Sequence, residues 1–169
     1  MKQSFFAVVA CAAMLPATMA FADEHVVNVA QQQIIPAGGQ SSSVGPAAFF
    51  TGRVRVDPLS PAGGSINASS AYVTFEPEAR SAWHTHPKGQ YLVVTSGVGL
   101  TQEWEKPVQI IRPGDVVWCP AGVKHWHGAA PTTAMTHLAI TGAVDGKNVN
   151  WMEKISDAQY NAREPAKAQ

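Results

Sequence analysis

Polar and apolar residues alternate along several short runs in the middle of the chain. Residues 53–56 read Arg-Val-Arg-Val, and residues 72–76 alternate as well. This period of two predicts strands with one buried face, because successive side chains of a strand point to opposite sides. Between residues 49 and 141 no apolar stripe of helical period is long enough to predict a helix. We therefore expect this region to be all-β.

Turn-forming residues divide the same region into short pieces. A loop with two prolines and two glycines is expected over residues 57–65. Further turns recur at Pro77-Glu78, Pro87-Lys88-Gly89, Ser96-Gly97, Lys106-Pro107, Arg112 to Asp115, Pro120-Ala121-Gly122 and Gly128 to Pro131. Short strands at this spacing predict an antiparallel sandwich or barrel.

The flanking segments have a different composition. Residues 23–48 are rich in Gln, Ser, Gly and Ala, and predict an N-terminal arm with one short strand at 26–29. After Gly142 the chain is polar again, and residues 156–160 predict a short helix capped by Ser156 or Asp157. We divide the chain into this arm, a barrel over residues 49–145, and a C-terminal segment, 146–169, with the short helix.

The first 22 residues have the features of a secretory signal peptide. Lys2 gives a positive start, residues 5–15 are apolar, and Ala20-Phe21-Ala22 matches a cleavage site. The apolar stretch is too short and wrongly flanked for a membrane anchor; the alternative is a buried N-terminal helix. We expect cleavage after Ala22 and a periplasmic or secreted protein.

Charge and cysteine content limit the partners. Twelve basic and twelve acidic residues give a net charge of zero, which becomes −1 when Lys2 is removed. This balance predicts no nucleic-acid or membrane partner, because no broad basic field is present. Cys11 leaves with the signal peptide, so Cys119 has no partner for an internal disulfide. Cys119 follows an apolar run, which predicts a buried thiol rather than one paired between chains.

Histidines in two separated segments suggest a metal site. His84 and His86 are two positions apart, so on a strand they point to the same face. A third imidazole from a second extended run, at His125, would complete a facial site. Neutral imidazole suits Mn, Fe, Ni, Cu and Zn. His127 lies two residues beyond His125 and is expected to face the same interior, as is His137.

Two spacings resemble the paired motifs of the cupin superfamily. They are His84-x-His86-x3-Gln90-x6-Gly97 and Gly114-x5-Pro120-x-Gly122-x2-His125. The chain departs from the usual pattern at Gln90, where most cupins have Glu, and at Glu78, which replaces a leading glycine. The resemblance implies an all-β, single-domain cupin (a double-stranded β-helix or jelly-roll barrel) with a metal in its mouth.

The chain also resembles a smaller subgroup, the bacterial cupin hydroxynitrile lyases. The similarity lies in residues 48–59, 82–87, 113–118 and 124–140. In that subgroup three His and one Gln hold a manganese or iron ion. The resemblance therefore implies His84, His86, Gln90 and His125 as metal ligands. It implies Mn(II) first and Fe(II) next, with Zn(II), Ni(II) and Cu(II) also compatible.

Gln90 has a chemical meaning in such a site. Three imidazoles and an amide leave the full charge on a divalent ion, whereas Glu would cancel one unit, so the ion would be a stronger Lewis acid. The carbonyl oxygen of Gln suits a hard ion such as Mn(II). The alternative is that Gln90 only supports another ligand or fills the barrel.

The resemblance assigns acid/base roles to His127 and His137. An unligated imidazole beside a metal is a natural proton carrier. The alternative for both is that they orient a ligand. His25 would be the third residue after cleavage and could complete a square-planar Cu(II) or Ni(II) site. The simpler interpretation of His25 is a histidine on an arm that binds nothing.

Three functions remain open at this point. The first is a lyase that cleaves or forms cyanohydrins, with an aldehyde and hydrogen cyanide as the products. The second is an Fe(II)- or Mn(II)-dependent oxygenase, and the third is a cupin that binds a metal or small molecule without turnover. In each case the partner is a small molecule, and edge pairing of small cupins predicts a homodimer or homotetramer.

Overall fold

The computed structural model describes residues 31–36, 38–63 and 66–162. The predicted signal peptide, the strand at 26–29 and His25 lie outside these residues. In the described part no helix is long and apolar enough to cross a membrane.

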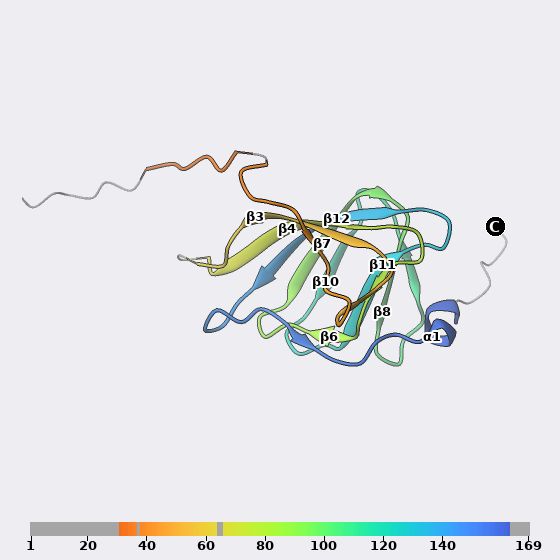
Figure 1. Cartoon of the computed structure of the whole chain (residues 1–169). Helices are drawn as coiled ribbons and strands as arrows, with labels where there is room; N and C mark the ends of the chain where they lie inside the picture. The colour runs from red at the N-terminus through yellow and green to blue at the C-terminus, as the bar shows by residue number, and fades with distance from the viewer. Residues whose placement is uncertain (1–30, 37, 64–65, 163–169) are drawn as a thin grey trace, which may run out of the picture. The chain divides into compact units, whose positions relative to one another are not determined.

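The first of two antiparallel sheets has six strands (Figure 1). In spatial order they are β1 (Ser43–Val44), β3 (Val54–Ser60), β4 (Ala68–Phe75), β12 (Met135–Gly142), β7 (Gln90–Gly97) and β10 (Val116–Cys119). The central strand β12 pairs over its full length with β4. On its other side it pairs with β7, with a register shift between Thr136 and His137.

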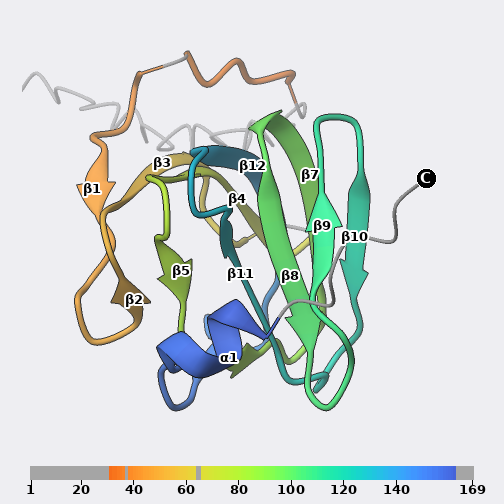
Figure 2. The ribbon, with the colours of Figure 1, turned by 90° about the vertical axis from the view of Figure 1, so that its right-hand side faces the viewer.

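The second sheet has seven strands and faces the first one (Figure 2). Its main path is β13 (Asn150–Trp151), β6 (His84–Thr85), β11 (His125–Ala129), β5 (Arg80–Ser81) and β2 (Phe50–Thr51). Two further strands, β8 (Gly99–Glu103) and β9 (Gln109–Ile111), continue the sheet, because β8 pairs with both β11 and β9. The all-β prediction is confirmed.

Side-chain alternation along β11 separates two apolar clusters. His125 and His127 face the space between the sheets, and Trp126, fully buried, points to the opposite side. The cluster between the sheets comprises Phe50, Val54, Phe75, Ala79, Val94, Ile111, Ala129 and Met135. The cluster behind the second sheet comprises Trp83, Leu100, Trp126, Ile155 and Tyr160. The interior therefore contains a polar site beside a dry core.

The helix α1 (Asp157–Asn161) covers the second cluster. Ser156 is its N-cap, and a capping box with Gln159 satisfies the first free N–H groups. Tyr160 donates its hydroxyl to the carbonyl of Ala129 at 2.7 Å, which ties the helix to β11. The predicted helix and its cap are confirmed.

Two segments differ from the prediction. Residues 57–60, expected in a loop, continue β3, because Asp57, Pro58 and Ser60 have partners on β4. Pro58 is tolerated because β1 pairs with β3 only at residues 55 and 56, so the missing N–H faces an open edge. Two further strands lie outside the predicted barrel. Strand β1, in the predicted N-terminal arm, pairs with β3, and strand β13, in the predicted C-terminal segment, pairs with β6.

Candidate metal centre

Both sheets contribute side chains to one polar site in the interior. His84 comes from β6 and His125 from the neighbouring β11, where the two residues are directly paired. Gln90 begins β7 of the opposite sheet. His86 follows β6, and all four side chains are buried. The topology thus brings together the four predicted ligands, which the sequence separates by up to 41 positions (125 − 84).

The imidazole rings lie close enough for a shared ion. The centroid of His84 is 4.3 Å from that of His125 and 5.0 Å from that of His86. The centroids of His86 and His125 are 5.3 Å apart. A second grouping is also close, because ligand atoms of His84, His125 and His127 all lie within 4.8 Å of one another. Proximity alone therefore leaves His86 and His127 as competing third ligands.

Hydrogen bonds to the main chain fix the direction of three of these rings. The Nδ1 atoms of His84, His86 and His125 donate to the carbonyls of Ala82, Asn148 and Val123, at 2.9, 2.6 and 2.9 Å. A carbonyl only accepts, so Nδ1 carries the proton in each ring and Nε2 carries the lone pair. Metal-binding histidines are commonly oriented in this way.

Buried atoms with unused bonding capacity converge from the same residues. Among the described residues, Nε2 of His86, Nε2 of His125 and Oε1 of Gln90 have no hydrogen-bond partner. The amide nitrogen of Gln90 donates to the hydroxyl of Thr141 at 3.0 Å, which leaves the oxygen free. An unsatisfied buried polar atom destabilises the fold by about 1–3 kcal/mol. A divalent metal would satisfy all three, so this donor set fits the ion that the fold implies.

His127 and His137 are hydrogen-bonded to each other. Nε2 of His137 lies 3.1 Å from Nδ1 of His127, so one nitrogen donates and the other accepts. Phe75 packs against both rings, at centroid distances of 5.6 and 5.7 Å. In the described part of the chain, the outer nitrogens, Nε2 of His127 and Nδ1 of His137, have no partner. Both histidines lie in the interior as predicted.

Burial keeps all five imidazoles neutral. It lowers the pKa of His125 to about 4 and that of His137 to about 3. Burial also lowers the pKa of His84 and of His127 well below 6.5, with added repulsion from neighbouring histidines. For His86 burial again lowers the pKa, although its contacts with Asn148 and Gln90 oppose it. Neutral rings offer lone pairs at physiological pH without competition from protons.

Sequence reasoning missed two supporting residues. Thr141 orients Gln90, and the carbonyl of Asn148 orients His86. Thr141 is opposite Gln90 in the β12–β7 register. Nothing in the local sequence marks either residue, since each acts through a tertiary pairing.

Comparisons with known proteins support the fold. Residues 71–141 match the model of the cupin domain. The chain is 59% identical over 123 residues to an (R)-mandelonitrile lyase of Granulicella tundricola, covering 73% of this chain and 94% of that protein. A cupin-like protein of Thermotoga maritima has 41% identity and a TM-score of 0.69, over 79% of this chain and 98% of that one.

A more distant structure shows the same fold. The polyketide cyclase of Streptomyces resistomycificus has 13% identity and a TM-score of 0.60, covering 77% of this chain and 91% of that one. This chain belongs to the cupin family. Within it, the chain resembles the hydroxynitrile lyase cupins, as the motifs around His84 and His125 predicted.

Proposed function

We propose that this protein is a metal-dependent lyase that cleaves cyanohydrins to an aldehyde and hydrogen cyanide, or joins the two. The observation that carries the proposal is a buried donor set beside a histidine pair, in a chain 59% identical to a mandelonitrile lyase. Two kinds of chemistry are needed, a group that stabilises an alkoxide and a group that carries a proton. The two sets of histidines are suited to these tasks.

The metal ligands in this proposal are His84, His86, Gln90 and His125. We choose His86 over His127 as the third imidazole because His86 has its Nδ1 on a carbonyl, whereas His127 is engaged with His137. The bound ion, Mn(II) or next Fe(II), would supply a Lewis acid for the hydroxyl oxygen of the substrate. Zn(II), Ni(II) and Cu(II) also bind imidazole, and metal analysis decides among them.

His127 and His137 would carry the proton. Nε2 of His127 takes the hydroxyl proton, while Nδ1 of His127 keeps its hydrogen bond to His137. The carbon–carbon bond to the nitrile then breaks, its electrons leave with cyanide, and the carbonyl forms. The imidazolium of His127 returns the proton to cyanide, which leaves as HCN. Burial lowers the pKa of His127, so its imidazolium gives up the proton readily in this last step.

The test combines metal analysis with cyanide release from racemic mandelonitrile. We expect the wild type to retain about one metal per chain and to release cyanide. His86→Ala should lose the metal, and His127→Ala should retain it but lose activity. Thr95→Ala, an exposed position on β7, is the control that should change neither. Retention of metal in His86→Ala and its loss in His127→Ala would overturn the ligand assignment.

Oxygen uptake separates the lyase from an oxygenase. The same samples, loaded with Fe(II), should consume no oxygen with a diketone or flavonol. Oxygen uptake without cyanide release would replace the lyase proposal. Metal retention without either activity would leave a binding protein.

We also propose that the protein is exported and self-associates. Export rests on the predicted signal peptide, and N-terminal sequencing of protein from the cell envelope should give Asp23 as the first residue.

Self-association rests on exposed apolar residues that share the outer face of the six-stranded sheet: Tyr72, Tyr91, Val116, Trp118 and Ile140. None of these five side chains is charged, so packing them against a second copy buries no charge among them. Tyr91→Lys should lower the mass measured by light scattering; an unchanged mass would contradict this face.

A further inference from the structure

A fourth imidazole, that of His127, lies beside two of the proposed metal ligands. Its ring centroid is 5.2 Å from that of His84 and 6.1 Å from that of His125. One ligand atom from each of these three histidines lies within 4.8 Å of the other two. The centroid of His86 is 5.0 Å from that of His84, so two different rings can complete a site beside His84.

The outer nitrogen of His127 is available for coordination. Nε2 has no hydrogen-bond partner among the described residues, and only 5% of His127 is exposed. Nδ1 of the same ring lies 3.1 Å from Nε2 of His137. When Nδ1 donates to His137, the lone pair is on Nε2, and His137 orients the ring as a second partner commonly orients a metal-binding histidine. His127 therefore has both a free donor atom and a supporting acceptor.

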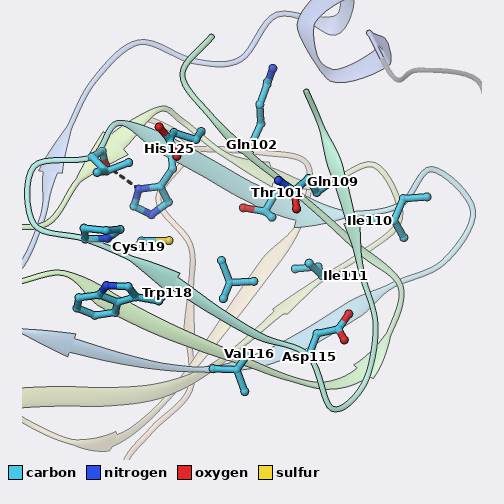
Figure 3. Close-up of a pocket in the computed structure, with 14 residues that line it drawn as sticks. Thr101, Gln102, Gln109, Ile110, Ile111, Asp115, Val116, Trp118, Cys119 and His125 are labelled. Carbon is cyan, nitrogen blue, oxygen red and sulfur yellow. Dashed lines mark hydrogen bonds between the residues drawn. The ribbon is translucent and has the colours of Figure 1, made fainter. Parts of the chain in front are cut away.

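His84 and His125 form a pair that either third ring can join. They are paired between β6 and β11, and each Nδ1 donates to a main-chain carbonyl. Figure 3 shows this hydrogen bond for His125 as a dashed line. In the described chain the nitrogens of His127 have no such main-chain partner, so the main chain does not fix the direction of this ring.

Hard and softer divalent ions favour different partners for this pair. A hard ion such as Mn(II) takes a carbonyl oxygen, which Gln90 supplies from the opposite sheet. Zn(II) takes imidazole nitrogen and can bind three histidines with a fourth position open. With Zn–N bonds of about 2.0–2.1 Å, the nitrogens of a tetrahedral site lie about 3.4 Å apart, so the three rings need to approach by at most about 1.4 Å from their present separation.

We propose that His84, His125 and His127 form a second site, specific for Zn(II), which overlaps the Mn(II) site. Mn(II) keeps the set proposed above, in which His86 and Gln90 stand in place of His127. Zn(II) binds nitrogen donors more tightly than Mn(II), so it displaces Mn(II) when both are present. With zinc on its Nε2, His127 takes no proton from a substrate, and the zinc form is inactive. This inhibition rests on the lyase function proposed above, whereas the zinc site itself does not.

Two single variants test the division of the ligands. Chelator competition on metal-free protein gives the affinities for Zn(II) and for Mn(II) in separate samples. In His127→Ala we expect zinc affinity to fall by about 100-fold or more, because loss of a supporting residue alone costs about 10–100-fold, and manganese affinity to stay that of the wild type. Gln90→Ala should give the reverse pattern, and Thr95→Ala, exposed on β7, should change neither affinity. Equal losses of both metals in His127→Ala, or no loss of zinc, overturn the proposal.

Nitrogen NMR of the histidine rings tests the same contact in the wild type. Zinc should shift the Nε2 signal of His127, which is identified by its absence in His127→Gln. The Nε2 signal of His86 should stay where it is in the metal-free protein. A shift at His86 without one at His127 would place zinc on the manganese ligands and overturn the proposal. This measurement also decides the matter if His127→Ala does not fold.

A zinc titration of the manganese-loaded protein distinguishes the possible failures. If both proposals hold, cyanide release from mandelonitrile stops at about one Zn(II) per chain. A manganese form without cyanide release, but with the expected affinities in His127→Ala and Gln90→Ala, would refute the lyase and support the zinc site. An active manganese form whose His127→Ala variant binds zinc as tightly as the wild type would refute the zinc site and retain the lyase.

Discussion

The buried histidines fall into two groups that differ in the hydrogen-bond partner of their ring nitrogens. In His84, His86 and His125 each Nδ1 donates to a main-chain carbonyl, so one tautomer is fixed. In the pair formed by His127 and His137, each ring is the partner of the other, and either nitrogen can carry the shared proton. A fixed lone pair suits coordination and an exchangeable proton suits transfer. In the proposed function, one residue type would therefore serve two tasks.

Burial lowers the pKa of the histidines in both groups, with a different consequence in each. The lowered pKa of the carbonyl-bound rings keeps their lone pairs available to a cation. In the pair, the same shift makes a protonated ring a better acid. Phe75 contacts both members of the pair and keeps water away from them. One physical cause, desolvation, therefore has two chemical consequences.

The largest expected effect comes from removing a carbonyl-bound ring. His125→Ala takes away an Nε2 donor at the point where β11 meets β6, so we expect loss of bound metal and of cyanide release. Metal analysis after gel filtration measures the first effect, and a cyanide assay the second. Circular dichroism should remain that of a β protein. Full metal content in this variant would contradict the proposal that the carbonyl-bound histidines hold the metal.

A smaller effect is expected from the pair. His137→Ala removes the partner of His127 but no proposed ligand, so the metal should remain bound while kcat falls by about 10²–10⁴-fold. His137→Gln, which retains a hydrogen-bonding group, should recover part of the loss. If His137→Ala loses metal in proportion to activity, the pair belongs to the coordination site and the comparison fails.

The sequence predicted on which side of the strand these side chains lie, but it did not predict their hydrogen-bond partners. The alternation His125-Trp126-His127 follows from strand geometry, and both histidines do face inward while Trp126 is buried behind the sheet. The carbonyls of Ala82 and Val123 are two residues before their histidines, so they are local features. They still could not be predicted, because they depend on side-chain torsions that a residue pattern does not encode.

Long-range features were harder to predict for a different reason. Strand β3 continues through Pro58 because it pairs with β4. The prolines and glycines of residues 57–65 predicted a loop there, and this pairing is not visible in the local sequence. Trp118 lies in an apolar run of the sequence, yet 48% of it is exposed on the outer sheet face, where it packs on Tyr91. Strand order decides which apolar face is covered, and the sequence pattern alone does not give strand order.

Acid should destabilise the metal-free protein through the carbonyl-bound group. In the unfolded chain His125 takes up a proton near pH 6.5, but in the fold burial lowers its pKa to about 4. Between these values the unfolded state binds more protons, so stability falls as the pH drops from 6.5 to 4, by roughly 3 kcal/mol from this residue. Urea unfolding of the metal-free protein at pH 7, 6, 5 and 4 measures the slope. His125→Asn should make the slope shallower by the share of this one residue, because four other buried histidines with a lowered pKa also contribute. An identical slope would show that His125 does not contribute.

The smallest effect separates orientation from coordination at Gln90. Thr141→Val removes the hydroxyl that accepts from the Gln90 amide nitrogen at 3.0 Å and leaves a side chain of the same shape. The amide can then rotate, so its oxygen is held less firmly, and metal affinity should fall by about tenfold. Competition with a chelator gives the affinity. Thr136→Val, on the same strand but half-buried with its hydroxyl on Thr74, is the matched control and should not change it.

Because Thr141 is not itself a proposed ligand, an affinity loss as complete as that of His125→Ala would mean that the variant disturbs β12 rather than Gln90. No loss at all would mean that Gln90 does not bind the ion.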